Sequence, residues 1–231
     1  MPGGSSNVDP VSQDVQESPS SFTEVSELLD AWKHRYGTQT VLFEQELNSA
    51  VCNSEDKELL TALIDRDILR IDSFKEVRWQ DPSKTHLRQD APTYKRVPMY
   101  EYLLASHVVP FYEILSEHAV GIEMFKKATD DLKYEALQFA FDTKHDEIFR
   151  GFLDTNIDLS DFREPKHNTP ILCDFMYRAE EGDEPNLVLL VEYGASLVAV
   201  DTVQSTPLMV AARVGNFKAA QWLLQYDVID I

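Results

Sequence analysis

The fold is decided near the end of the chain by the stretch STPLMVAARVGN, residues 205–216, which runs on to a Trp-Leu-Leu at residues 222–224. Its Thr-Pro-Leu start opens a helix, a small Ala-Ala pair follows on one face, and Gly215-Asn216 ends that helix. A second helix then presents apolar residues at positions 219, 220, 223 and 224. Two helices this short cannot bury their apolar faces alone, so the pattern predicts a unit that stacks on copies of itself.

This segment resembles the ankyrin repeat, and similar patterns precede it along the chain. The preceding copy begins at Thr169-Pro170-Ile171, 37 residues before the matching position of the last copy. Because the ankyrin period is about 33 residues, we expect an insertion around residues 180–185, between the two helices of that copy. Gly194 then suits a left-handed helix end. Asp174 stands where the family prefers a small apolar residue, so we expect either a distorted repeat or an internal hydrogen bond to its carboxylate.

Three earlier copies are more diverged. In the nearest one, Leu137, Ala140 and Phe141 take the places of the Leu and the Ala pair, and Asn156 replaces the glycine of the closing turn. The spacing from residue 98 to residue 118 is 20, as it is from 136 to 156 and from 207 to 227. The earliest copy carries paired apolar residues at 59–60 and 63–64. The resemblance covers roughly residues 38–231 and is clearest at 131–231.

The predicted fold class is all-α: an α-solenoid of about five stacked ankyrin-like helix-turn-helix repeats with short hairpin turns. In chain order we expect a disordered acidic tail (1–22), a capping helix (23–37), a degenerate repeat (38–71), a basic and aromatic insert (72–97), a second degenerate repeat (98–130), an ankyrin-like repeat (131–163), an ankyrin-like repeat with an insertion (164–200) and an ankyrin repeat (201–231). The segment 23–37 has one apolar face, so binding a partner is the alternative to capping the stack.

The insert at 72–97 differs in charge from the rest of the chain. It carries six basic and four acidic side chains, whereas the first 32 residues carry six acidic and no basic ones. Trp79 and Tyr94 add aromatic surface. Loops of this length are usually functional or disordered, so a binding role and a solvated linker both remain open.

Bulk composition limits the classes of partner. The 231 residues are 43% hydrophobic, which can support a sizeable core, and the net charge is −19. That charge disfavours nucleic acid and anionic membrane as partners, because phosphate binding needs clustered Lys and Arg. Two interpretations of this charge remain: a protein partner with a basic surface, or a role in solubility alone. Two distant cysteines, Cys52 and Cys173, indicate free thiols in a reducing compartment, and no signal sequence or membrane span is evident, so we expect a cytoplasmic and/or nuclear protein.

The sequence carries no recognisable catalytic or metal motif. The six histidines are scattered, and there is no His-Glu-x-x-His, Cys-x-x-Cys, nucleophile elbow or glycine-rich phosphate loop. We therefore expect a protein that is not an enzyme and that needs no cofactor or metal.

The resemblance to ankyrin repeats implies a protein-interaction scaffold or adaptor. Similar proteins bind through the turn tips and the exposed side of the first helices. By that resemblance the partner-binding residues are Asp142, Thr143, Asn168, Met176, Tyr177, Thr202, Val203, Ser205, Arg213 and Val214, with Trp79 and Tyr94 added from the insert. Two alternatives stay open: an acidic inhibitor that masks a basic surface of a transcription factor or enzyme, and an N-terminal targeting region of a larger multidomain protein.

Overall fold

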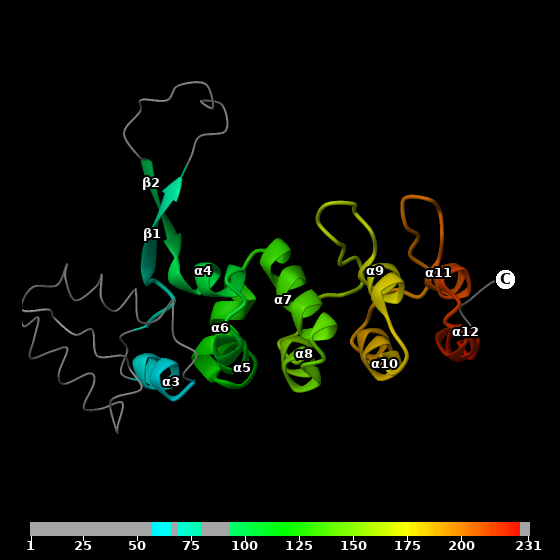
Figure 1. Cartoon of the computed structure of the whole chain (residues 1–231), viewed down its shortest axis with the longest axis horizontal. Helices are drawn as coiled ribbons and strands as arrows, with labels where there is room; N and C mark the ends of the chain where they lie inside the picture. The colour runs from blue at the N-terminus through cyan, green and yellow to red at the C-terminus, as the bar shows by residue number, and fades with distance from the viewer. Residues whose placement is uncertain (1–56, 66–68, 80–92, 227–231) are drawn as a thin grey trace, which may run out of the picture. The chain divides into compact units, whose positions relative to one another are not determined.

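The computed structural model describes residues 57–65, 69–79 and 93–226 (Figure 1), and for residues 74–79 and 93–95 it describes the backbone. The expected acidic tail, the capping helix, the first helix of the earliest repeat, the middle of the insert and the last five residues lie outside the described residues. All described residues belong to one compact unit, 51–231.

The described part of the chain is mostly helical, as predicted. Its ten helices are α3 (Lys57–Asp65), α4 (Met99–Ala105), α5 (Val109–Glu117), α6 (Ala119–Lys127), α7 (Asp130–Asp142), α8 (Asp146–Leu153), α9 (Ile171–Arg178), α10 (Glu184–Glu192), α11 (Pro207–Val214) and α12 (Phe217–Leu223). Two strands, β1 (Phe74–Trp79) and β2 (Thr93–Pro98), complete the described elements.

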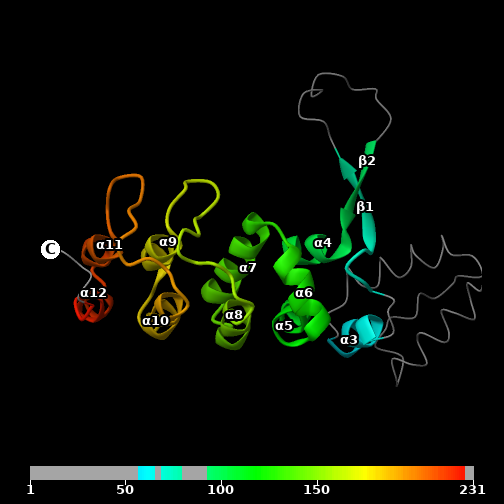
Figure 2. The ribbon, with the colours of Figure 1, turned by 180° about the vertical axis from the view of Figure 1, so that it is seen from behind.

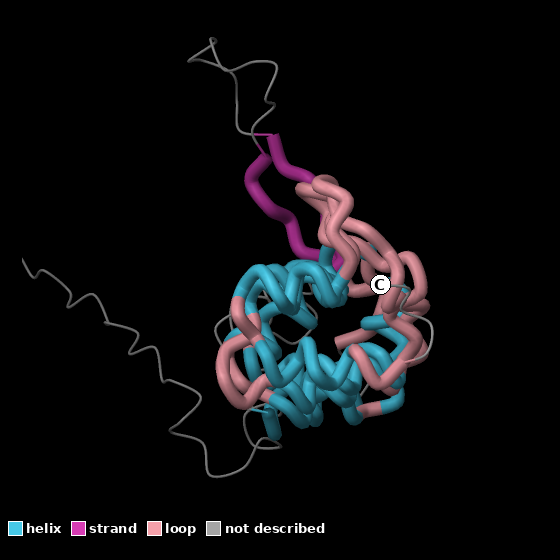
Figure 3. Tube along the Cα trace, turned by 90° about the vertical axis from the view of Figure 1, so that its right-hand side faces the viewer, coloured by secondary structure: helices cyan, strands magenta, loops and turns pink. Residues whose placement is uncertain are grey.

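The helices are arranged in two rows, which Figures 1 and 2 show from opposite sides. The loop-side row contains α4, α7, α9 and α11, and the far row contains α5, α8, α10 and α12. Helices α5, α8, α10 and α12 pack against one another in that order, and each helix of the loop-side row packs on its partner in the far row. The loops 154–170 and 193–206 leave on the side of the loop-side row, together with the β-hairpin (Figure 3).

An aromatic core joins the helix pairs. Phe125 of α6 and Phe152 of α8 stack with ring centroids 4.3 Å apart. Phe141 of α7 meets Phe175 of α9 edge-on at 4.8 Å, and Phe149 of α8 lies 5.9 Å from the same ring. All these side chains are buried. Aromatic rings bury large apolar areas, so they supply much of the energy that holds successive pairs together.

Local signals in the sequence explain the helix boundaries. Gly194 and Gly215 adopt positive φ angles of 98° and 78°, and Asn156 adopts 63°. The left-handed turns predicted at Gly194 and Asn156 are therefore confirmed.

The carboxylate of Asp174 accepts hydrogen bonds from the Tyr134 hydroxyl and, at 2.6 Å, from Arg178 Nε. The expected internal hydrogen bond to this carboxylate is confirmed.

The insert, which was expected only as a long loop, forms a strand in each of its two described parts. Strands β1 and β2 pair antiparallel, from Phe74 opposite Pro98 to Trp79 opposite Thr93. Both runs combine aromatic or β-branched residues with charged ones, and the aromatic and β-branched residues favour strands. Helix α6 was not predicted either: residues 119–127 form a helix packed on α5.

Candidate protein-interaction surface

Each of the two loops that precede α9 and α11 is organised by one buried carboxylate. Glu164, five residues before Thr169, accepts hydrogen bonds from the backbone N–H groups of Lys166, at 3.0 Å, and His167. In the second loop Asp201 accepts from the N–H groups of Val203 and Ser205, at 2.9 and 2.8 Å. Asp201 is also five residues before a threonine, Thr206, so in both loops a carboxylate at the same position accepts hydrogen bonds from the backbone of its own loop.

Both loop carboxylates are held in the charged state. Burial by itself would raise the pKa of Asp201, but the N–H groups of Ser205 and Val203, the Tyr177 hydroxyl and the charge of Arg213 outweigh it and lower that pKa. The pKa of Glu164 is also lowered, because N–H groups and the nearby His167 outweigh its burial. Ionised carboxylates accept stronger hydrogen bonds than neutral groups, so both loops are firmly positioned at neutral pH.

Asp201 also links its loop to the loop-side row. The Tyr177 hydroxyl of α9 donates to Asp201 Oδ2 at 3.0 Å, and Arg213 Nη1 of α11 donates to the same hydroxyl at 2.8 Å. Arg213 Nη2 donates to Ser205 Oγ in the loop. Tyr177 remains 40% exposed and Val203, at the tip of the loop, 64% exposed. Hydrogen bonds between two helices and a loop thus hold Tyr177 and Arg213 in place. We call these two residues, together with the exposed Thr202, Val203 and Met209 of the same loop and helix, the α9–α11 patch.

The other predicted residues lie nearby or one helix pair away. Val214 follows Arg213 and is exposed, as is Thr202 in the loop. Asn168 is exposed in the preceding loop with a φ of 55°. Asp142 and Thr143 end α7, where Arg178 Nη1 donates to Asp142 at 3.4 Å. A polar connection therefore runs from α7 to α9 as well as from α9 to α11.

Two predicted contact residues belong to the interior. Met176 is 0% exposed and packs in the core, so its assignment to a binding surface was wrong. It precedes Tyr177 by one position, and neighbouring helix positions point about 100° apart, so the two side chains leave α9 in different directions. Ser205 is also buried, and its hydroxyl is used by Arg213. It supports the patch and is not a contact residue itself.

The two aromatic residues of the insert lie on the hairpin. Trp79 pairs with Thr93, and Tyr94 pairs with Arg78, at adjacent positions of the register. Backbone pairing therefore brings Trp79 and Tyr94 within one residue of each other along the ladder, although they are distant in sequence. Their part in binding stays a prediction.

Sequence reasoning missed Met209, which is 55% exposed on α11. It lies four residues before Arg213, and residues four apart are neighbours on a helix surface. That spacing, together with the apolar character of Met209, was the available signal. Phe217, the first residue of α12, is another exposed apolar side chain that was not singled out.

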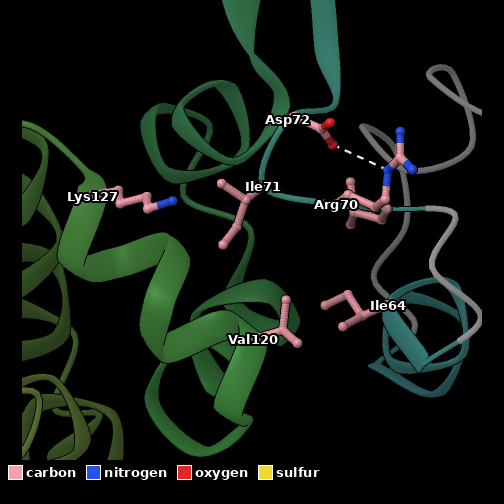
Figure 4. A pocket seen from close by; sticks show the side chains of 7 residues that line it. Ile64, Arg70, Ile71, Asp72, Val120 and Lys127 are labelled. Atoms are coloured by element: carbon pink, nitrogen blue, oxygen red, sulfur yellow. Dashed lines mark ion pairs between the residues drawn. The ribbon is translucent and has the colours of Figure 1, made fainter.

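A hollow of about 380 Å³ lies between α3, the segment after it and α6 (Figure 4). Ile64, Ile71 and Val120 form apolar walls, while Arg70 Nε pairs with Asp72 Oδ1 at 3.1 Å on the rim. The described residues that line this hollow are apolar or charged, and they include no histidine, cysteine or hydroxyl side chain. We therefore place the candidate site at the α9–α11 patch and not in this hollow.

Other features of the described residues bear on chemistry. Burial raises the pKa of the Cys173 thiol to about 12, so this thiol is protonated at neutral pH and is a poor nucleophile. No group of three or more His, Cys, Asp or Glu side chains within the described residues is arranged to hold a metal ion. None of the helices within those residues has the length and apolar character needed to cross a membrane.

Comparison of the chain with protein-family models, with curated proteins and with solved structures finds no match.

Proposed function

We propose that this chain is a non-enzymatic protein-interaction module, a scaffold or adaptor built as a solenoid of ankyrin-like repeats. In this proposal the partner binds the α9–α11 patch. The pairs α4–α5, α7–α8, α9–α10 and α11–α12 would be the repeats, and α6 and the hairpin would be insertions between them. Solenoids of stacked repeats commonly use extended surfaces of this kind to bind other proteins.

One observation carries the proposal: Tyr177, Arg213 and the loop of Asp201 come from separate segments and are tied together while their outer surfaces stay exposed. A rigid surface loses little conformational entropy when a partner binds. Tyrosine and arginine are also the side chains most often found at the energetic centres of protein interfaces. Both points support a binding role for this patch.

The test compares surface variants of the full chain in affinity capture with quantitative mass spectrometry. Val203→Asp places a charge at the exposed loop tip, and we expect it to abolish recovery of the specific partner. Gln221→Asp, an exposed position on α12, adds the same charge in the far row and serves as the matched control. Tyr177→Ala should weaken capture as well.

A double variant, Trp79→Ala with Tyr94→Ala, tests the hairpin in the same experiment. If capture is lost in this variant and retained in Val203→Asp, the partner binds the insert and the proposed site is wrong. Circular dichroism melts of each variant should match the unmodified chain, which separates lost contact from lost folding.

A second candidate function follows from the charge balance. The chain has 40 acidic and 21 basic side chains, which suits an inhibitor that covers a basic surface. Binding of that kind depends on screened electrostatics and should fall steeply as salt rises. Capture that is lost in about 0.5 M NaCl but unaffected by Val203→Asp would favour this inhibitor over the patch-binding scaffold.

A further inference from the structure

Arg213 presents an exposed positive charge that is not neutralised by a bonded carboxylate. Its Nη1 donates to the Tyr177 hydroxyl at 2.8 Å and its Nη2 to Ser205 Oγ, both neutral acceptors. Among the ion pairs between described residues, none includes Arg213. A guanidinium carries five N–H groups, so donors remain for a ligand after these two bonds.

The carboxylate in this network is buried and already accepts three hydrogen bonds. Asp201 is buried and accepts from the Tyr177 hydroxyl and from two backbone N–H groups. The negative charge of this cluster is therefore inside, and the positive charge of Arg213 faces the solvent. In a chain of net charge −19, such a place attracts an acidic group that most of the surface repels.

Exposed apolar side chains lie on the same helix and the same loop as this charge. Met209 lies four residues before Arg213 on α11 and is 55% exposed, and Val203 projects from the loop that Arg213 holds through Ser205. Tyr177 is also next to this charge, since its hydroxyl is bonded to Arg213. A cation with exposed apolar side chains on the same helix and loop suits a ligand that carries a negative charge next to an apolar group.

We propose that the partner places an aspartate or glutamate carboxylate on Arg213, within an extended peptide segment whose neighbouring apolar side chain packs on Met209 and Val203. Arginine and carboxylate match as planar groups that form two parallel hydrogen bonds. A single arginine in an acidic chain suits one carboxylate better than a doubly charged phosphate. The inference rests on the proposed function, because it names the chemistry of the partner at the same patch.

The experiment uses a display library of short random peptides, selected on the full chain. We expect the recovered sequences to be enriched in Asp or Glu beside an apolar residue. One selected peptide is then synthesised with its acidic residue as Glu, as Gln and as phosphoserine, and each version is titrated by fluorescence polarisation. Replacing Glu by Gln should weaken binding to the unmodified chain about tenfold.

The same titrations on Arg213→Gln and Lys218→Gln chains identify the contact. In Arg213→Gln the Glu and Gln peptides should bind within about twofold of each other, because the coupled partner is gone. Lys218→Gln also removes one positive charge, but the Lys218 side chain pairs with Glu181 and is not one of the patch residues, so the tenfold difference should persist. Arg213→Lys keeps the positive charge, so it should retain part of the tenfold difference between the Glu and Gln peptides.

Several outcomes would overturn the inference. Peptides without acidic enrichment, an equal loss from Glu to Gln in both the unmodified and the Arg213→Gln chains, or tighter binding of the phosphoserine version would each do so. If one of these outcomes occurs but the selected peptides still bind the Val203→Asp chain more weakly than the unmodified chain, the patch binds proteins by other chemistry and the proposed function stands. If no selected peptide responds to Val203→Asp or Tyr177→Ala, the patch is not a binding site and both proposals fail.

Discussion

At the scale of single residues, the loop carboxylates are the most consequential groups in this chain. Asp201 satisfies the backbone of its own loop and at the same time orients Tyr177, which in turn orients Arg213. A single buried side chain therefore sets both the loop conformation and the geometry of the α9–α11 patch. Glu164 holds the preceding loop in the same way, but among the described residues no tyrosine donates a hydrogen bond to it.

Replacing Asp201 by Asn should destabilise the protein by about 1–3 kcal/mol, because charge-assisted hydrogen bonds to two backbone N–H groups are weakened. Chemical denaturation at neutral pH measures this loss. Asp161→Asn is the matched control: Asp161 is exposed and pairs with Arg163 at the surface, so its replacement should cost little.

The same pair of variants gives a pH signature. The folded-state pKa of Asp201 is lowered, so its stabilising contribution is fully present above the unfolded pKa and is lost as pH falls through the folded pKa. Stability of the unmodified chain should therefore drop below about pH 4. Asp201→Asn should show a smaller acid-dependent loss than Asp161→Asn, and equal slopes would contradict the assigned role.

At the scale of elements, close helix contacts decide which helix pairs can form. Helix α6 lies against α5 because Gly121 has no side chain at the contact. A Cβ at this position would lie 2.3 Å from the carbonyl oxygen of Ile114 and 2.9 Å from Cα of Leu115. The obstacle is backbone and not a flexible side chain, so it cannot move aside without shifting α5.

Gly121→Ala should therefore destabilise the protein by about 1–3 kcal/mol, although alanine favours helix by about 1 kcal/mol over glycine. Val120→Ala, at the adjacent and partly exposed position, should cost less than about 1 kcal/mol. Urea denaturation of both variants checks the difference. A Gly121→Ala variant as stable as the unmodified chain would show that α6 is not packed this closely.

At the scale of the whole molecule, stability comes from contacts between neighbouring helix pairs. Helix α12 packs on α11 and α10, and Leu223 supplies a fully buried side chain there. The following residue, Leu224, is 52% exposed. These two adjacent leucines allow a test of whether the last pair unfolds separately, as the proposed solenoid requires.

Leu223→Asp buries an unpaired charge and should cost about 3–5 kcal/mol, enough to unfold the last pair. In hydrogen exchange, protection should be lost in α11 and α12 and kept in α7 and α8. Leu224→Asp, with the same charge at an exposed site, should leave protection nearly unchanged. Uniform loss of protection in Leu223→Asp would indicate a single cooperative unit and would contradict the proposed repeat array.

Much of the helical architecture could be predicted from local sequence. Gly194 and Asn156 mark left-handed turns, and the apolar spacing marks helix faces, because both signals depend on neighbouring residues. The hairpin could not be recognised in this way, because strand pairing joins residues that are distant in the sequence, such as Phe74 and Pro98. Strand propensity depends on such pairing more than on the residues alone.

The sequence by itself determined a mostly helical chain with short helices, left-handed turns at Asn156 and Gly194, and a strongly acidic composition. Only the tertiary structure decided which side chains form a surface. It placed Met176 in the core and Met209 outside, and it brought Tyr177, Asp201 and Arg213 together. The physical reason is that exposure and hydrogen-bond partners depend on how each helix is rotated against its neighbours, which is set by contacts between residues far apart in the chain.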